Sequence, residues 1–113
     1  MEKKIKLFLD DMFRFSNETD YFAFFYKSKV HVMINLILCA EKKYTYEDLC
    51  NEITPKFASR STLQSILKEG LDKKYFDKKI NEKDRREKFY KINNLTKKKL
   101  NMWVDRQKFI FKA

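Results

Sequence analysis

The stretch that decides the fold is residues 59–92, which read SRSTLQSILKEGLDKKYFDKKINEKDRREKFYKI. In its first half, apolar residues recur at helical spacing: Leu63, Ile66, Leu67 and Leu71. This spacing predicts a helix from Arg60 to about Lys73, with Ser59 as its N-cap. In the second half the period changes to alternation over Tyr75–Ile80 and Lys88–Ile92, on either side of a polar cluster. A β-hairpin is therefore predicted directly after the helix.

The residues before this stretch predict a second, shorter helix close to the first. Thr45 can cap a helix whose positive first turn holds Glu47 and Asp48, and that helix must end before Pro55. Two short helices with a tight connector are typical of a helix-turn-helix. The hairpin that follows the second of these helices is then expected to be a wing.

Helical periodicity extends to both ends of the chain. It predicts an N-terminal helix from Ile5 to Phe15, a break at Ser16–Asp20, a core helix at Tyr26–Glu41, and a last helix capped by Thr96. A single glycine and a single proline disfavour an all-β fold with many tight turns. The predicted fold class is mainly α (α+β), a winged helix-turn-helix in one domain spanning 1–113. Its predicted parts are an N-terminal dimerisation helix in 1–25, the helix-turn-helix and wing in 26–93, and a C-terminal helix in 94–113.

The charge of the chain is concentrated in its second half. There are 26 Lys and Arg against 16 Asp and Glu, a net charge of +10, yet residues 1–56 hold nine of each sign. The whole excess therefore belongs to residues 57–113. Such a one-sided field favours a polyanionic partner, with nucleic acid first and an anionic membrane second. A solvated lysine-rich surface without a partner is the remaining interpretation of the charge alone.

Several function classes find no support in the sequence. Cys39, Cys50 and the single histidine, His31, cannot provide a disulfide framework or a four-ligand zinc set, so a reducing cytoplasm is expected. No phosphate-binding glycine loop, Ser/His/Asp set or paired-carboxylate site is visible, and we expect neither enzyme activity nor a cofactor. His31 is interpreted as a core residue, Asp10 and Asp11 as surface charges. Either cysteine can sense oxidants only with an accessible thiolate, and both lie in segments that are predicted to be partly buried.

The apolar stretch at residues 21–40 carries charged and polar residues, which disfavours a membrane span. Binding to an anionic membrane surface is the least favoured alternative, because the basic residues are spread over the wing and two helices and form no single amphipathic cationic helix; no membrane partner is expected.

The predicted DNA-binding residues lie on the second helix and at the hairpin tip. On the helix, the face opposite the apolar stripe carries Arg60, Ser61, Gln64, Ser65 and Lys68. At the wing, four cations surround one acid: Lys83, Asp84, Arg85, Arg86 and Lys88. Arg and Gln can read guanine and adenine edges, Ser and Lys suit phosphates, and a wing arginine suits a narrow minor groove. The alternative is that these residues form an ordinary solvated surface without a partner. This alternative has more weight for the helix than for the wing.

These residues also carry a family resemblance. The run Thr62–Leu67, followed by Tyr75–Arg86 with its Asp84-x-Arg86 motif, resembles the recognition helix and wing of the MarR-type winged-helix regulators. Within them it is most similar to the small staphylococcal accessory regulator (Sar) branch, over about Val30 to Trp103. The resemblance implies a homodimeric transcription regulator on A/T-rich promoter DNA. It also implies that Asp84 and Arg86 are the wing acid and the minor-groove arginine, and that Leu95-Thr96 opens the C-terminal helix.

The N-terminal third supports a dimer on independent grounds. Eight aromatic residues lie between Phe8 and Tyr26, more than a core of this size buries alone. We therefore expect the first and last helices to form the interface of a homodimer. The predicted interface residues are Phe8, Met12, Phe13, Trp103 and Phe109.

The predicted function is a sequence-biased, double-stranded DNA-binding transcription regulator that acts as a homodimer on promoter DNA. Two alternatives stay open: a winged-helix protein of plasmid or phage replication or partition, and a basic module that binds an acidic protein. The sequence does not identify the promoter, the direction of regulation or a small-molecule effector.

Overall fold

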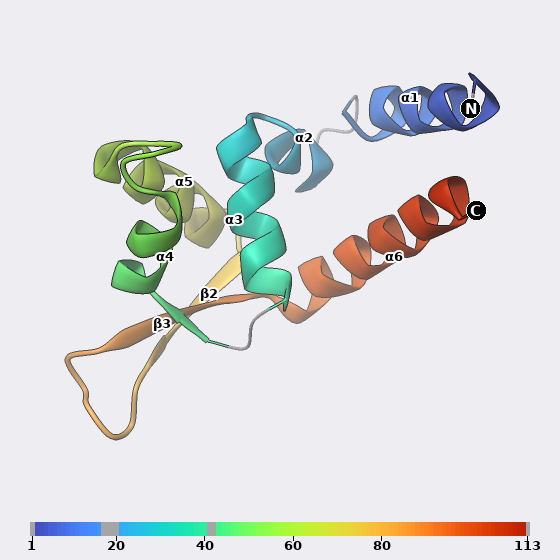
Figure 1. Ribbon diagram of the computed structural model, residues 1–113. Helices are drawn as coiled ribbons and strands as arrows, with labels where there is room; N and C mark the ends of the chain where they lie inside the picture. The colour runs from blue at the N-terminus through green and yellow to red at the C-terminus, as the bar shows by residue number, and fades with distance from the viewer. Residues whose placement is uncertain (1, 17–20, 41–42, 113) are drawn as a thin grey trace.

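The computed structural model describes residues 2–16, 21–40 and 43–112. Figure 1 shows a helical body, a β-hairpin that projects from it, and two long helices that extend to the other side. The elements in chain order are α1 (Glu2–Ser16), α2 (Tyr21–Phe25), α3 (Lys29–Ala40), β1 (Tyr44–Thr45), α4 (Tyr46–Ile53), α5 (Arg60–Asp72), β2 (Phe76–Ile80), β3 (Lys88–Ile92) and α6 (Asn94–Phe111). The predicted winged helix-turn-helix is confirmed.

Both helices of the helix-turn-helix begin where the capping residues predict. At α4, the Asp48 amide donates to Thr45 Oγ1 at 3.0 Å while the Thr45 amide donates to Asp48 Oδ2 at 3.0 Å, which forms a capping box. At α5, the Thr62 amide donates to Ser59 Oγ at 3.1 Å. Each cap satisfies an amide that has no partner within its helix, and this fixes the two starting points along the chain.

Other predicted boundaries were wrong. Residues 21–25 form a separate short helix, and the core helix begins at Lys29 instead of Tyr26 because Ser28 Oγ accepts the His31 amide at 3.2 Å. The last helix begins at Asn94, where Asn93 Oδ1 accepts the Leu95 amide at 2.9 Å, so the predicted cap at Thr96 is wrong. The predicted break at Ser16–Asp20 falls mostly outside the described residues.

The sheet is antiparallel and has the strand order β1-β3-β2. Phe76 lies opposite Ile92 and Ile80 opposite Lys88, as expected for the predicted hairpin, whereas β1, which pairs Tyr44 with Tyr90, was not predicted. Beneath the sheet the core gathers the apolar faces of α3, α4 and α5, and four aromatic side chains of α2: Tyr21, Phe22, Phe24 and Phe25. Half of the eight N-terminal aromatics therefore lie in the core of the protomer itself.

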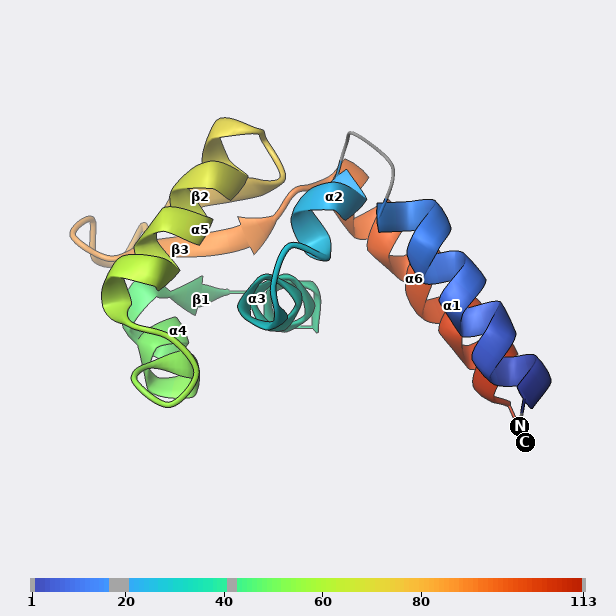
Figure 2. The same cartoon turned by 90° about the horizontal axis from the view of Figure 1, so that it is seen from above.

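Helices α1 and α6 form an antiparallel arm. Figure 2 shows them side by side, and the Lys4 ammonium near the start of α1 donates a hydrogen bond to the Lys112 carbonyl oxygen just after the end of α6. Arg106 Nε lies 2.8 Å from Asp11 Oδ2, and the rings of Phe8 and Phe111 meet edge to face at 5.4 Å between centroids. Asp11 is buried in this contact, so the interpretation of Asp11 as a surface charge is wrong.

The longest helix of the described part of the chain is α6, and none of the helices described there is long and apolar enough to cross a bilayer.

Candidate nucleic-acid interface

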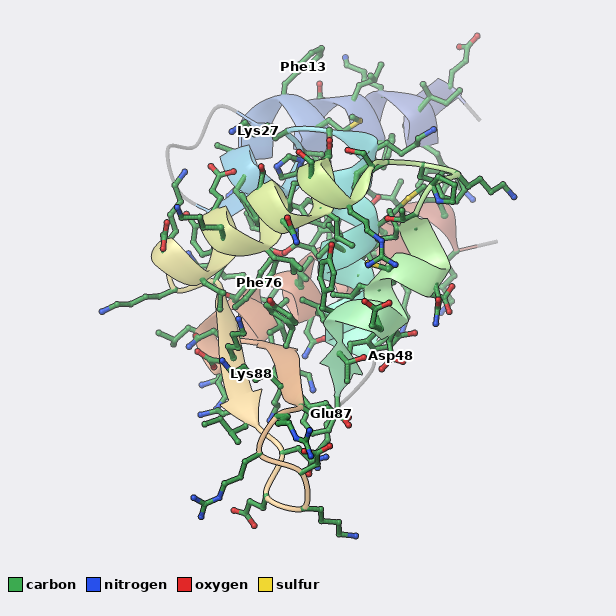
Figure 3. All side chains as sticks on the ribbon, turned by 90° about the vertical axis from the view of Figure 1, so that its left-hand side faces the viewer. Phe13, Lys27, Asp48, Phe76, Glu87 and Lys88 are labelled. Carbon is green, nitrogen blue, oxygen red and sulfur yellow. The ribbon has the colours of Figure 1, made fainter. Side chains whose placement is uncertain are left out.

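The second helix of the helix-turn-helix turns a polar face outward. All five side chains predicted for this face are exposed: Arg60, Ser61, Gln64, Ser65 and Lys68. The opposite face of α5 is buried through Leu63, Ile66 and Leu67. In Figure 3 the yellow-green α5 crosses the face turned to the viewer, and the hairpin tip projects below it. The helix and the wing therefore lie on one side of the molecule.

The wing tip is shaped by hydrogen bonds within its own turn. The Lys83 amide donates to Asn81 Oδ1 and the Arg86 amide to Asp84 Oδ1, both at 3.0 Å. Asp84 Oδ1 also lies 4.0 Å from Arg86 Nε, while the Arg86 side chain is 98% exposed. Asp84 thus fixes the backbone at Arg86 and leaves its guanidinium extended into solvent, where nothing in the described structure covers it. The other predicted wing residues, Lys83, Arg85 and Lys88, are exposed as well.

A groove of about 430 Å³ separates the wing from α5. Its lining comes from Thr45, Tyr46 and Glu47 around the start of α4, from Gln64 of α5, and from Lys78, Arg86, Glu87, Lys88 and Tyr90 of the hairpin, so it holds two carboxylates as well as three cations. Lys78 was missed among the predicted site residues, although the alternation of β2 carried the signal. Its register places it opposite Tyr90, and its Nζ lies 5.3 Å from the centre of that ring. The groove joins residues of the recognition helix and of the wing into one continuous surface.

The side chain of Arg60 is not extended freely into solvent, because it forms an ion pair with Glu47. Its Nη1 and Nη2 lie 3.1 and 3.3 Å from the two carboxylate oxygens of Glu47 on α4, and its guanidinium lies over the Tyr46 ring. The guanidinium of Arg60 lowers the pKa of the Glu47 carboxyl group through this hydrogen bond. Both side chains are more than half exposed, so this ion pair lies at the protein surface, at the start of α5. Before Arg60 can bind the edge of a base, its guanidinium must therefore release the carboxylate of Glu47.

If Arg60 contacts DNA, Glu47 competes with the DNA for its guanidinium, and Glu47→Gln is then expected to tighten DNA binding by roughly tenfold, on the scale of one charge-assisted contact. The gain should disappear when Arg60→Gln is present as well. Glu52→Gln, the same change on the same helix, is the matched control and should alter affinity far less. Fluorescence anisotropy with a labelled duplex measures all four proteins. An equal gain from both glutamate substitutions would indicate a general charge effect and not competition for Arg60.

His31 and Cys50 are buried, and Cys39 is partly exposed. The His31 side chain is 8% exposed, its Nδ1 lies 2.6 Å from Ser28 Oγ, and burial lowers its pKa. Cys50 is buried in the core. Cys39 is half-buried, and burial raises the pKa of its thiol. A raised pKa disfavours the thiolate that an oxidant sensor needs.

The predicted dimer residues fall into two groups on the arm. Phe13 and Phe109 are 65% and 68% exposed, and within the protomer the Arg106 guanidinium lies 5.4 Å from the centre of the Phe109 ring. Phe8, Met12 and Trp103 are half-buried, and Trp103 packs against Phe25 and donates a hydrogen bond from Nε1 to Tyr26 Oη. Three further apolar residues of α6 are exposed and were not predicted as interface residues: Leu95, Met102 and Phe111. The signal for Leu95 and Met102 was spacing, since 95, 102 and 109 are seven residues apart and lie along one stripe of a helix.

Together, the helix-turn-helix, the hairpin wing and the helical arm define a MarR-like winged helix-turn-helix fold. No protein-family model matches the chain, and no curated protein matches it. Among solved structures it is similar to a variant of ZitR from Lactococcus lactis, with a TM-score of 0.61 at 10% identity over 96% of this chain and 75% of that chain. A second ZitR variant matches with a TM-score of 0.54 at 15% identity, over 98% and 80%.

The chain is also similar to BpsR from Bordetella bronchiseptica, whose DNA binding is regulated by 6-hydroxynicotinic acid. That match has a TM-score of 0.59 at 9% identity and covers 93% of this chain and 71% of that chain. ZitR and BpsR are MarR-family regulators. At these identities the likeness establishes a shared fold. The resemblance to the Sar branch stays a prediction.

Proposed function

We propose that this protein is a transcription regulator that binds double-stranded promoter DNA as a homodimer. The observation that carries the proposal is the placement of the exposed polar face of α5 and the basic wing on one side of the molecule, joined by the groove that Gln64, Lys78, Arg86 and Lys88 line. A helix suits the major groove and a projecting arginine suits a narrow minor groove beside it. A preference for A/T-rich DNA agrees with this reading of Arg86.

A dimer follows from the same layout. The arm leaves Phe13 and Phe109 exposed, and large exposed aromatic side chains on a small protein mark an association surface. Two-fold symmetry about the arm would place two copies of α5 about 34 Å apart, on successive turns of one face of DNA. Lysines and arginines supply most of the affinity through phosphates, while Gln64 and Arg86 bias the sequence that is read.

The proposal is tested by fluorescence anisotropy with the DNA upstream of the protein's own coding sequence and with a scrambled duplex. We expect tighter binding to the native duplex and a linear fall of log affinity with log salt concentration. Salt-sensitive binding of equal strength to both duplexes would contradict a sequence-reading regulator. Absence of binding to either, together with co-purification of an acidic protein, would support the protein-interaction alternative.

Arg86→Ala tests the wing. We expect a loss of about 1–3 kcal/mol in DNA-binding free energy, because the exposed guanidinium would no longer enter a groove. The fold should be unaffected, since the Arg86 side chain is 98% exposed and only its amide bonds Asp84. Arg86→Lys is the companion variant and should recover part of the affinity through its charge. Unchanged affinity of Arg86→Ala at matched salt would remove Arg86 from the interface.

A further inference from the structure

A second group of cations lies on the side of α5 away from the wing. Lys27 precedes α3, Lys29 is the first residue of α3, and Lys56 lies in the connection between α4 and α5. All three side chains are exposed. Figure 3 shows Lys27 on one side of α5 and Lys88 on the other. We call these three residues the α3-side lysines. None of them was predicted as a site residue, because they lie in the half of the sequence that carries no net charge.

Contacts with Phe57, in the connection before α5, and with Glu69, near the end of α5, place these lysines beside that helix. Lys29 Nζ and Lys56 Nζ each lie 5.5 Å from the centre of the Phe57 ring, which precedes the first turn of α5. Lys27 Nζ lies 3.4 Å from the carboxylate of Glu69, which belongs to the last turns of α5. The α3-side lysines therefore follow the flank of α5 from its beginning towards its end. The cations of the groove beside the wing follow the opposite flank.

Between α3 and α5 lies a hollow of about 400 Å³ whose lining includes several polar side chains. The side of α5 contributes the hydroxyl groups of Ser61, Thr62 and Ser65, and the other side contributes Lys27. His31 also lines the hollow, and its buried Nε2 lies 3.7 Å from the carboxylate of Glu69. Hydroxyl and ammonium groups are the donors that proteins use for DNA phosphates.

One acid, Glu69, also lines this hollow, and cations balance its charge. Its carboxylate lies 2.9 Å from Lys73 Nζ as well as 3.4 Å from Lys27 Nζ. The ammonium group of Lys73 lowers the pKa of Glu69, so the carboxylate is charged and anchors the two lysines to α5. With Lys29 and Lys56 included, the flank keeps an excess of positive charge. Glu69 therefore positions Lys27 at the edge of the hollow. The net charge of the flank stays positive.

We propose that the α3-side lysines bind the phosphates of the DNA strand that borders the major groove on the side away from the wing. The inference rests on the proposed function. A helix about 10–12 Å across fills a major groove about 12 Å wide, so one strand passes along each of its flanks. The wing and its groove meet one strand, and the α3-side lysines meet the other. Because these contacts go to phosphates, they add affinity without adding sequence preference.

The test compares two triple variants of the full chain. In the first, Lys27, Lys29 and Lys56 are each replaced by Gln. In the control, Lys97, Lys98 and Lys108 are each replaced by Gln; these are exposed lysines of α6, which extends away from the face shown in Figure 3. Both variants lose the same net charge. Anisotropy titrations across salt concentrations give the affinity and the salt dependence of each, and circular dichroism confirms that each is folded.

We expect the first variant to bind native and scrambled duplexes about 10- to 100-fold more weakly than the wild type, with a salt slope shallower by about 2.7, or 0.9 for each lost phosphate contact. The control should keep most of the wild-type slope. Equal slopes for the two variants would overturn the inference and leave the proposed function standing. Failure of the wild-type protein to bind either duplex would overturn the proposed function itself, and the inference with it.

Discussion

Replacing Phe13 and Phe109 together by Glu is expected to prevent the proposed homodimer from forming, to leave a 13.9 kDa monomer, and to weaken DNA binding by roughly 100-fold or more. The two rings are 65% and 68% exposed on the arm, so their replacement leaves the core of the protomer intact. Carboxylates at these positions would have to be desolvated in the interface, which opposes association. Without the second subunit, binding to the second half-site is no longer intramolecular, and that loss accounts for the large effect.

The conservative pair Phe13→Leu with Phe109→Leu is the control, because it keeps apolar side chains at both positions. Sedimentation velocity measures the mass of each protein, and anisotropy measures its affinity. The control should remain dimeric. A dimeric Glu variant, or a monomeric Glu variant with wild-type affinity, would contradict the proposed role of the arm.

Replacing Gly70 by Ala is expected to lower the free energy of unfolding by about 1–3 kcal/mol, the usual range for overpacking a core. Gly70 lies in α5, and a methyl group there would come within 2.9 Å of Phe76 Cγ and closer still to Cδ2 and Cε2 of the same ring. The ring is 2% exposed at the start of β2, so it has no open space to move into. Alanine favours helices over glycine by about 1 kcal/mol, which offsets only part of this cost.

Urea denaturation followed by circular dichroism measures the change. Ser65→Ala, on the exposed face of the same helix, is the matched control and should change stability little. Adding Phe76→Leu to Gly70→Ala should cost less than Phe76→Leu costs alone, since the smaller side chain relieves the overlap. Equal stability of Gly70→Ala and the wild-type protein would mean that α5 and β2 are not packed as closely as the structure has them.

The sequence predicts the parts of the fold that depend on local interactions. The caps at Thr45 and Ser59 place α4 and α5 because each uses backbone amides three residues away. Alternation predicts β2 and β3, since the hairpin joins neighbours in sequence. The strand β1 could not be predicted in this way, because its partner β3 lies more than forty residues further along the chain. The helix α2 was missed because it is one short turn, buried by tertiary packing.

The residues of the candidate site also divide into those that local sequence patterns predict and those that come together only through tertiary packing. Exposure of the predicted face of α5 follows from its apolar stripe, and exposure of the wing cations follows from their place at a turn. The ion pair between Arg60 and Glu47 joins two helices, so helical periodicity gives no sign of it. The α3-side lysines were missed for the same reason. Lys27 and Lys29 come next to α5 only when α3 packs against it.

Hydroxyl-radical footprinting of the wild-type protein on its own upstream DNA tests the central claim, that a winged-helix dimer reads two half-sites, most directly. We predict two protected segments whose centres lie about one helical turn, roughly 10 base pairs, apart on one face of the duplex. Protection that is uniform along the DNA, or a single protected segment at concentrations that saturate binding, would contradict it.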